Sequence, residues 1–309
     1  MSHTLHRSHR DTIHVETAVV LEHERHAADQ HVIRLQAPHS ARHAQPGSFV
    51  HVRCSDGRPM RRPLSIQRAD ADSGWIEILF KVVGDGTSEL ATAEPGAALS
   101  VIGPIGRPFE HDARHTRPLL IGGGVGIPPM VFLAERLRAM PGMEPFAAFG
   151  SEVPFPFHAI VSRMLVPGMP HGVTHAAPLL ESWGVPSRLA SRAHQPGTFH
   201  GFATELAQAW LDALPGDELS RVCVYACGPH AMLQATVALA ARYALPCQIS
   251  LEEYMACAVG GCAGCTVEVL TPTGPSMKRV CVDGPVFDGY TVYPALRSVR
   301  NDSAHQTTQ

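Results

Sequence analysis

The sequence contains no apolar run that reaches the roughly 18 residues of a membrane-spanning helix. Residues 1–10 are polar and rich in histidine, without the apolar core that a secretory signal needs. Basic side chains are not in excess, because 25 Lys and Arg against 28 Asp and Glu give a formal net charge of −3. This balance argues against general nucleic-acid binding, which requires a concentrated basic surface. No paired carboxylates and no Ser–His–Asp set stand out, so nothing indicates acid–base or nucleophilic catalysis.

Four of the eight cysteines gather near the C-terminal end, with the spacing C-x4-C-x2-C-x15-C. Four thiolates in this order are typical of a plant-type [2Fe–2S] cluster. Structural zinc is the alternative, although zinc sites usually show two close cysteine pairs and only one is present. The other four cysteines are scattered, which together with a thiolate cluster favours a reducing cytoplasm. The expected metal ligands are Cys257, Cys262, Cys265 and Cys281.

Glycines in the cysteine stretch support this interpretation. Gly260, Gly261 and Gly264 let the backbone approach closely enough for its N–H groups to point at sulfur. Downstream, residues 266–270 and 277–282 read as two strands joined by a turn at residues 271–276. Such a hairpin would carry Cys281 back to the loop.

Residues 13–109 show short alternating strands separated by turns rich in Gly, Pro and Asp. About six strands at this spacing predict a small antiparallel barrel. The expected strands are residues 14–22, 31–37, 48–54, 64–68, 75–83 and 98–102.

From residue 117 onward, apolar strands alternate with helices, which predicts a parallel sheet covered on both faces. The expected strands are residues 118–121, 145–150, 174–177 and 221–226, and the expected helices are residues 130–140, 157–165, 201–214 and 231–243. Residues 168–200 are rich in Pro, Ser and His and read as a long surface excursion. The fold class is therefore α/β plus β. We expect a disordered tail at 1–12, a barrel at 13–112, an α/β domain at 113–248, a cluster subdomain at 249–290 and a tail at 291–309.

A glycine loop follows the first apolar strand of the α/β part. Its N–H groups precede a helix and could bind phosphate, although a structural turn is the alternative. The loop is not G-x-G-x-x-G, so the dinucleotide-fold fingerprint is not met. Glu152, after the next strand, could bond a ribose hydroxyl and favours NAD over NADP. The loop residues are Gly122, Gly123, Gly124 and Gly126.

Three further motifs are ambiguous when each is taken alone. The run from Arg61 to Ser65 could clamp a cofactor phosphate and bond a flavin nitrogen, or be a solvated basic turn. Residues 84–87 (Gly-Asp-Gly-Thr) are a second candidate phosphate cradle. Cys227, followed by Gly228 and Pro229, ends a strand at the edge where such sheets bind ligands. Its thiol could touch a nicotinamide or be buried and structural.

In this order, the motifs resemble the ferredoxin reductase superfamily. Arg62-Pro63-Leu64-Ser65 is similar to its flavin motif R-P-x-S, residues 84–87 to its G-x-G-T, residues 122–129 to its pyridine-nucleotide loop, and residues 227–233 to its C-G-P-x-x-M-L. Residues 250–265 and 281–287 resemble the electron-transfer subunit of class 1B dihydroorotate dehydrogenase. Tyr254 stands where that family often has Arg, and Ala258 where Gly is usual.

The resemblance implies FAD on the barrel, with Arg62 near its phosphates and Ser65 near the isoalloxazine. It also implies NAD at the glycine loop and at Gly228 and Pro229, and a separate FMN-containing dihydroorotate dehydrogenase subunit, usually in a heterotetramer. The further FAD contacts that it implies are Pro63, Leu64, Leu79, Phe80, Lys81, Gly84, Gly86 and Thr87.

The function expected from the sequence is an electron relay between the partner's flavin and NAD+ through [2Fe–2S] and FAD. A reductase that serves another partner, such as a hydrogenase or ferredoxin, shares every cofactor and is the first alternative. A non-enzymatic zinc-binding or redox-sensing module is the second.

Overall fold

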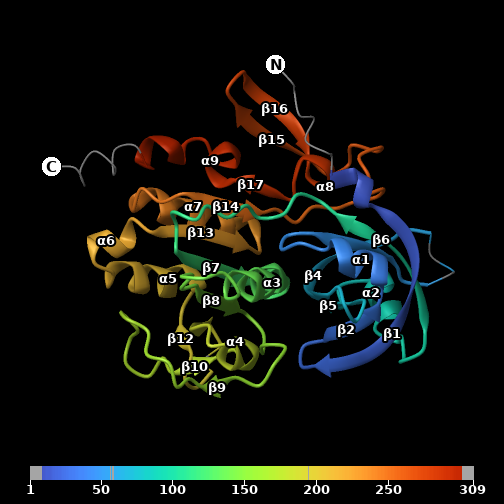
Figure 1. Ribbon diagram of the computed structural model, residues 1–309, viewed down its shortest axis with the longest axis horizontal. Coiled ribbons are helices and arrows are strands. Elements are labelled where there is room, and N and C mark those ends of the chain that lie inside the picture. The colour runs from blue at the N-terminus through green and yellow to red at the C-terminus, as the bar shows by residue number, and fades with distance from the viewer. Residues whose placement is uncertain (1–8, 56, 58, 194, 301–309) are drawn as a thin grey trace.

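The structure, a computed structural model, describes residues 9–55, 57, 59–193 and 195–300. Three parts follow one another along the chain: a small barrel, a seven-stranded sheet with helices, and a C-terminal hairpin region. Figure 1 shows the barrel on the right, the sheet on the left and the C-terminal region at the top. The predicted α/β plus β architecture is confirmed.

The barrel is closed, antiparallel and six-stranded, as predicted. Its strands pair in the order β1-β2-β5-β4-β3-β6, and β1 also pairs with β6, which closes the ring. Alternate side chains point inward, as the period of a strand requires; in β5 these are Ile76, Ile78 and Phe80. The strands are β1 His14–His26, β2 Gln30–Gln36, β3 Phe49–Arg53, β4 Arg62–Asp70, β5 Trp75–Lys81 and β6 Ala98–Ile105, with helices α1 Pro38–His43 and α2 Asp85–Leu90 between them.

The seven-stranded sheet has the order β12-β11-β8-β7-β13-β14-β17. All its pairs are parallel except β14 with β17. Strand β7 comes first in the chain and lies in the middle, with β8 on one side and β13 on the other. The order therefore reverses between β7 and β13, where open α/β sheets bind ligands. The strands are β7 Arg117–Gly123, β8 Phe146–Ser151, β11 Ser187–Ser191, β12 Phe199–His200, β13 Val222–Cys227, β14 Cys247–Ser250 and β17 Val286–Asp288.

Helices cover both faces of this sheet. One face packs against α3 and α4, and the other against α5 and α7. Two prolines open α3, where first-turn N–H groups lack partners in any case. The elements are η2 Gly124–Gly126, α3 Ile127–Leu137, α4 Pro178–Ser182, α5 Ala203–Asp212, α6 Gly216–Leu219 and α7 His230–Arg242.

Two expectations for the region after β8 are wrong. Residues 157–165 are not a helix, because β9 (Ile160–Val161) pairs with β10 (His175–Ala176) and two prolines precede the segment. Residues 168–200 are not all a surface excursion, because they contain the fully buried strand β11. Its polar residues are bonded: Ser187 Oγ accepts from the Ala177 N–H at 3.1 Å, and Arg188 donates to the Met164 carbonyl at 2.6 Å.

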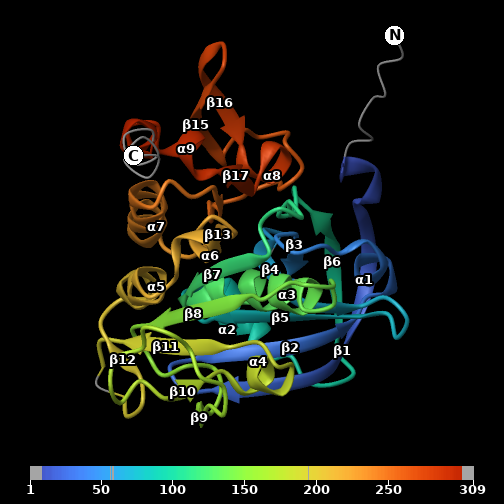
Figure 2. The same cartoon turned by 60° about the vertical axis from the view of Figure 1, so that its left-hand side comes forward.

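The hairpin near the C-terminus is confirmed, with shifted bounds. Strands β15 (Thr266–Thr271) and β16 (Gly274–Arg279) pair up to Thr271–Gly274, so the turn has two residues rather than six. Cys281 lies on the short helix α8 (Val280–Asp283) and not on the second strand. Figure 2 shows the hairpin projecting from the top of the molecule. Strand β17 then pairs with β14 of the seven-stranded sheet, so the cluster region is joined to that sheet by backbone hydrogen bonds.

Helix α3 fixes the barrel against the sheet. Phe132 of α3 packs in the core of the barrel. Glu135, one turn of helix later, accepts from Arg68 of β4 at 2.8 Å, with both side chains largely buried. The first helix after the glycine loop therefore contacts the same strand that carries the R-P-L-S motif.

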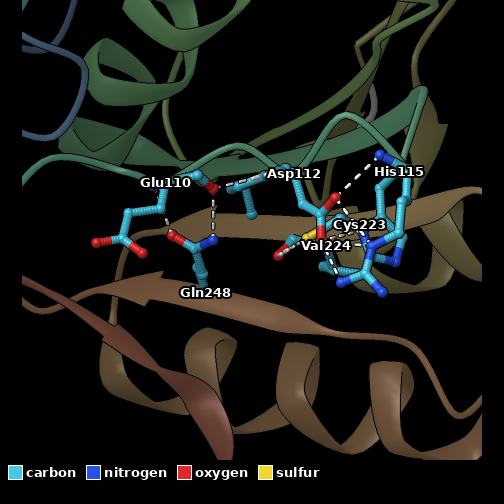
Figure 3. A network of polar contacts seen from close by, with 8 residues as sticks. Glu110, Asp112, His115, Cys223, Val224 and Gln248 are labelled. Atoms are coloured by element: carbon cyan, nitrogen blue, oxygen red, sulfur yellow. Dashed lines mark hydrogen bonds and ion pairs between the residues drawn. The ribbon is translucent and has the colours of Figure 1, made fainter.

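The linker between the barrel and the sheet is also held in place (Figure 3). The Glu110 N–H donates to Gln248 Oε1 at 2.9 Å, and Gln248 Nε2 donates to the Glu110 carbonyl at 2.6 Å. The Tyr225 hydroxyl donates to the same carbonyl at 3.2 Å. Strands β13 and β14 thus fix the point at which the chain leaves the barrel.

The two expected tails lie partly outside the described residues. Residues 9–12 form a 3₁₀ helix (η1, His9–Thr12), so the predicted disorder is wrong there, and residues 1–8 lie outside the description. At the other end, α9 (Gly289–Val292) is followed by helical residues 296–300, and Leu296 packs on the core. Residues 301–309 lie outside the description. Among the helices of the described ranges, none has the length and apolarity to cross a bilayer.

Candidate functional site

The four predicted metal ligands come together as two pairs of sulfurs. Cys265 Sγ and Cys281 Sγ lie 3.3 Å apart, and both residues are buried. Cys257 and Cys262 form the second pair, where the Cys262 N–H also donates to Cys257 Sγ at 3.4 Å. The hairpin was expected to carry Cys281 back to the loop, and Cys281 does reach it, on helix α8.

This pairing fits a two-iron cluster, in which each iron takes two protein ligands. Structural zinc instead needs about four ligands around one ion, and within the described ranges no three His, Cys, Asp or Glu side chains are grouped to hold one ion. The loop backbone also turns toward sulfur: the Gly261 N–H donates to Cys257 Sγ at 3.3 Å. Left-handed φ angles at Ala258, Gly260 and Ala263 (+55°, +84° and +55°) make these tight turns.

The electrostatics of the two pairs differ. Burial raises the pKa of Cys257, but hydrogen bonds from the backbone N–H groups of Val259 and Cys262, among others, lower it to about 6. Burial, followed by the adjacent Cys265, raises the pKa of Cys281 to about 12. Cys281 therefore needs a bound cation to become a thiolate at neutral pH. Cys262 is exposed, whereas Cys265 and Cys281 are buried. We therefore call Cys257 and Cys262 the outer pair, which lies on the solvent side of the loop, and Cys265 and Cys281 the inner pair.

The barrel touches the cluster region directly. The Arg107 N–H, just after β6, donates to the Gly284 carbonyl at 2.6 Å, and Arg107 forms a bridge with Pro285. Gly106 has φ +100°, and a Cβ there would lie 2.4 Å from Pro285 Cδ. Only glycine fits this contact with Pro285, which lies four residues after Cys281.

Two of the predicted FAD motifs meet at the end of the barrel. The Arg62 guanidinium lies so close to Gly86 that a Cβ on this glycine would be 2.9 Å from Arg62 Nε. The Thr87 hydroxyl accepts from the Gly84 N–H at 3.2 Å and donates to the Gly84 carbonyl at 2.9 Å, which holds the loop before α2. Arginine and a glycine loop side by side can bind a diphosphate.

The other predicted FAD contacts divide between the two faces of the barrel wall. Leu64 and Phe80 belong to the barrel core, and Phe80 stacks on His31 with ring centroids 5.1 Å apart. Leu79 is buried outside that core, and Lys81 is half-buried. In the paired register, Pro63 lies opposite His51 and Ser65 opposite Phe49. Paired residues share a face, and the alternating neighbours Val50, Val52 and Leu64 lie in the barrel core. Phe49, His51, Pro63 and Ser65 therefore lie on the outer wall.

The two predicted nucleotide loops pack against each other at the switch point. Strands β7 and β13 pair up to Gly122 and Cys227. A Cβ on Gly126 would lie 2.3 Å from the Cys227 carbonyl oxygen, and one on Gly123 would lie 2.5 Å from Met232 Sδ. Gly124, with φ +55°, has open space around it. Pro229 then precedes α7 as its N-cap.

Cys227 itself is fully buried. Burial, followed by the nearby Glu252, raises the pKa of its thiol well above the usual value. The Cys227 thiol donates to Glu252 Oε1 at 3.8 Å. Glu252 retains solvent contact, although its crowded surroundings raise its pKa. The Cys227 thiol is thus protonated at neutral pH. Glu252, which accepts its hydrogen bond, is the group of this pair that contacts solvent.

Sequence reasoning missed three residues at this junction: Glu252, Met255 and His51. Glu252 follows β14, the parallel neighbour of the strand that ends in Cys227, so the strand order alone could have placed it. His51 alternates with Val50 and Val52, which marks it as pointing away from the barrel core. The contact between His51 and Met255 has no signal in the sequence.

Two family models match separate parts of the chain. The iron–sulfur cluster binding domain of dihydroorotate dehydrogenase B matches residues 252–293. The oxidoreductase FAD-binding domain matches residues 17–109. The predictions of FAD on the barrel and of an iron–sulfur cluster rather than zinc in the C-terminal part are thereby confirmed.

Relatives and solved structures agree over most of the chain. An electron transfer subunit of dihydroorotate dehydrogenase B (NAD(+)) from Shouchella clausii is 33% identical over 84% of this chain and 91% of its own. The subunit of the same name from Desulforamulus reducens is 30% identical over 86% and 93%.

A solved NADH-dependent reduced ferredoxin–NADP oxidoreductase chain has a TM-score of 0.69 at 23% identity, covering 94% of this chain and 98% of that one. A ferredoxin reductase of carbazole 1,9a-dioxygenase has a TM-score of 0.58 at 19% identity, covering 76% and 67%. These two show the fold. On the shared length, the identity and the cysteine loop together, the chain belongs to the electron transfer subunit family of dihydroorotate dehydrogenase B (NAD(+)).

Proposed function

We propose that this chain passes electrons between NAD and a separate catalytic subunit that oxidises dihydroorotate, and so serves pyrimidine biosynthesis. FAD exchanges a hydride with the nicotinamide and single electrons with the iron–sulfur cluster. The chain holds these groups and tunes them. The dihydroorotate site belongs to the partner.

One observation carries the proposal: a single short segment touches all three sites. After β14, Glu252 contacts Cys227 of the nucleotide loop, Met255 faces His51 of the barrel wall, and Cys257 begins the cluster loop. Five residues span at most about 18 Å when extended. The nicotinamide end of the sheet, the flavin-bearing wall and the cluster therefore lie within the reach of one segment.

Each predicted binding residue has a defined task in this proposal. Arg62 and the loop at Gly86 bind the FAD diphosphate by charge-assisted hydrogen bonds. Gly123 and Gly126 bring the backbone N–H groups of the first nucleotide loop against the second, at the start of α3, where the NAD diphosphate binds. The N–H groups that point at Cys257 lower the charge on its sulfur and tune the cluster.

The partner docks on the exposed side of the cluster loop. Cys262 is exposed and Tyr254 is 94% exposed, while Cys265 and Cys281 are buried. The proposed partner is an FMN-containing catalytic subunit, with two copies of each chain in a heterotetramer. We also propose that the complex works in the cytoplasm, where thiolate ligands stay reduced, and that the units are residues 13–112, 113–248 and 249–290.

The test is co-expression with the products of neighbouring genes. The complex should contain FMN, FAD and iron, and should reduce NAD+ with dihydroorotate, whereas this chain alone should not. A complex that forms but transfers electrons only to ferredoxin or hydrogenase would overturn the proposed partner. A colourless chain with stoichiometric zinc would overturn the cofactor assignment as well.

A further inference from the structure

His51 lies where the barrel wall meets the cluster segment. It belongs to β3, and in the register it stands opposite Pro63 of the R-P-L-S motif. Its neighbours Val50 and Val52 point into the barrel, so His51 points outward, on the same wall as Ser65. From the other side, the Met255 carbonyl, two residues before Cys257, faces the imidazole.

The imidazole is buried and its polar atoms are orphaned. His51 is 1% exposed. Among the residues that the structure describes, none makes a hydrogen bond of ordinary geometry to Nδ1 or Nε2. Buried polar atoms are nearly always bonded, so an orphaned pair needs an explanation. Two main-chain carbonyl groups face the ring, those of Arg61 and Met255. Both belong to segments that carry cofactor motifs, so we look for the role of the imidazole in how these segments are held.

The ring is neutral, and its cationic neighbour is already engaged. Burial, and then the charge of Arg61, lower the pKa of His51 to about 4. Arg61 donates to the Ser100 carbonyl at 2.6 Å and to Ser100 Oγ at 2.8 Å, and it reaches only the main-chain carbonyl of His51, at 3.3 Å. A neutral imidazole keeps one N–H to donate.

We propose that His51 is a positioning residue of the electron path, whose N–H donates to the Met255 carbonyl and so fixes the segment leading into Cys257 against the flavin-bearing wall. The bond joins β3 to the cluster loop across the gap that electrons must cross. It deepens the proposed function and rests on FAD and iron–sulfur binding at the sites described above. Cofactor binding closes the hydrogen bond that the structure leaves open.

The test compares H51L, H51Q and the control H39L. Leucine keeps the bulk of the ring without a donor, and glutamine restores an N–H. His39 is a half-buried histidine of the same barrel, on α1, with its own contact to the Thr12 carbonyl. Each protein is first assayed for flavin and iron, so that a failure of cofactor binding is seen separately from a failure of the hydrogen bond.

Two readouts follow. In rapid mixing with NADH, H51L should reduce the flavin at the wild-type rate but the cluster about five- to tenfold more slowly, the factor that one net hydrogen bond is worth. In the cofactor-loaded protein, amide hydrogen exchange of residues 253–257 should be faster in H51L by a similar factor. H51Q should restore both quantities, and H39L should change neither.

Three results would overturn the inference. The first is wild-type cluster reduction together with wild-type exchange in H51L. The second is an equal defect in H51L and H51Q, which would mean that the site needs the shape of the ring and not its N–H. The third is equal slowing of flavin and cluster reduction. Should H51L fail to fold, H51M takes its place, because methionine also lacks a donor; exchange of residues 253–257 should then be faster in H51M than in H51Q, and equal exchange in the two would overturn the inference.

Discussion

The contact between the two nucleotide loops makes a sharp prediction for G126A. Gly126 has φ −85°, which alanine adopts readily, so the substitution adds only a methyl group. That methyl would lie 2.3 Å from the Cys227 carbonyl oxygen and 2.5 Å from the Gly228 nitrogen, both in the main chain. Ordinary contact needs about 3.4 Å, so the loops must separate by about 1 Å. Overpacking of this kind costs about 1–3 kcal/mol.

A shift of this size should affect the reaction with NADH more than the fold. Misplacing reacting groups by ~1 Å lowers rates about 10²-fold, so G126A should lose about two orders of magnitude in kcat/KM for NADH with ferricyanide as acceptor. Its flavin and iron–sulfur absorption should match the wild type, because the barrel and the cysteine loop are untouched. The control is G216A, whose added Cβ meets nothing within 4 Å. Wild-type kcat/KM in G126A would refute the idea that these loops form the nucleotide site.

Three further predictions concern the other sites. C265S should lose the iron–sulfur absorption and keep FAD, since the inner sulfur pair is broken while the barrel is intact; full iron–sulfur absorption in the variant would contradict the ligand set. R62A should bind FAD about 10–100-fold more weakly in equilibrium dialysis, because it loses a charge-assisted hydrogen bond of about 1.5–3 kcal/mol, and unchanged affinity would remove Arg62 from the site. The third concerns pH: the native pKa of His51 is about 4, below the usual value of about 6.5, so the unfolded chain binds its proton first as pH falls. Native stability contributed by the neutral ring is complete above about pH 6.5 and is lost toward pH 4, by about 2.5 kcal/mol at pH 4.5. In urea titrations of cofactor-free protein, the free energy of unfolding should fall less in H51L than in the wild type between pH 7.5 and pH 4.5, by about 2.5 kcal/mol. An equal fall in the two proteins would contradict the buried, neutral ring.

Local sequence patterns predicted the barrel and most of the sheet because each strand carries its own alternation and its own turn residues. The same reasoning failed at β11, where Ser187, Arg188 and Ser191 look like loop residues. They can be buried because main-chain groups outside the strand bond to them, as the bond from Arg188 to the Met164 carbonyl illustrates. A hydrophobic pattern cannot reveal partners that lie 24 residues away.

For the candidate site, too, the local motifs were predictable from the sequence and their long-range contacts were not. The cysteine spacing, the R-P-L-S strand and the glycine loop were each visible as short motifs. How they meet was not visible, because Gly126 reaches Cys227 only through the strand order, and Glu252 reaches the same thiol from a third strand. Left-handed backbone at Ala258 explains why glycine is usual there in the family that the sequence resembles. The expected second strand through Cys281 was wrong because a short helix, and not a longer strand, returns that cysteine to the loop.

If this chain is an electron relay, NADH alone must reduce both its flavin and its cluster. Anaerobic titration of the purified protein with NADH, followed by visible absorption, tests it most directly. We expect the flavin and iron–sulfur bands both to bleach, with an end point of about 1.5 equivalents per chain, because FAD takes two electrons and a [2Fe–2S] cluster one. An iron–sulfur band that stays oxidised while the flavin is fully reduced, or a flavin that NADH leaves oxidised, would contradict it.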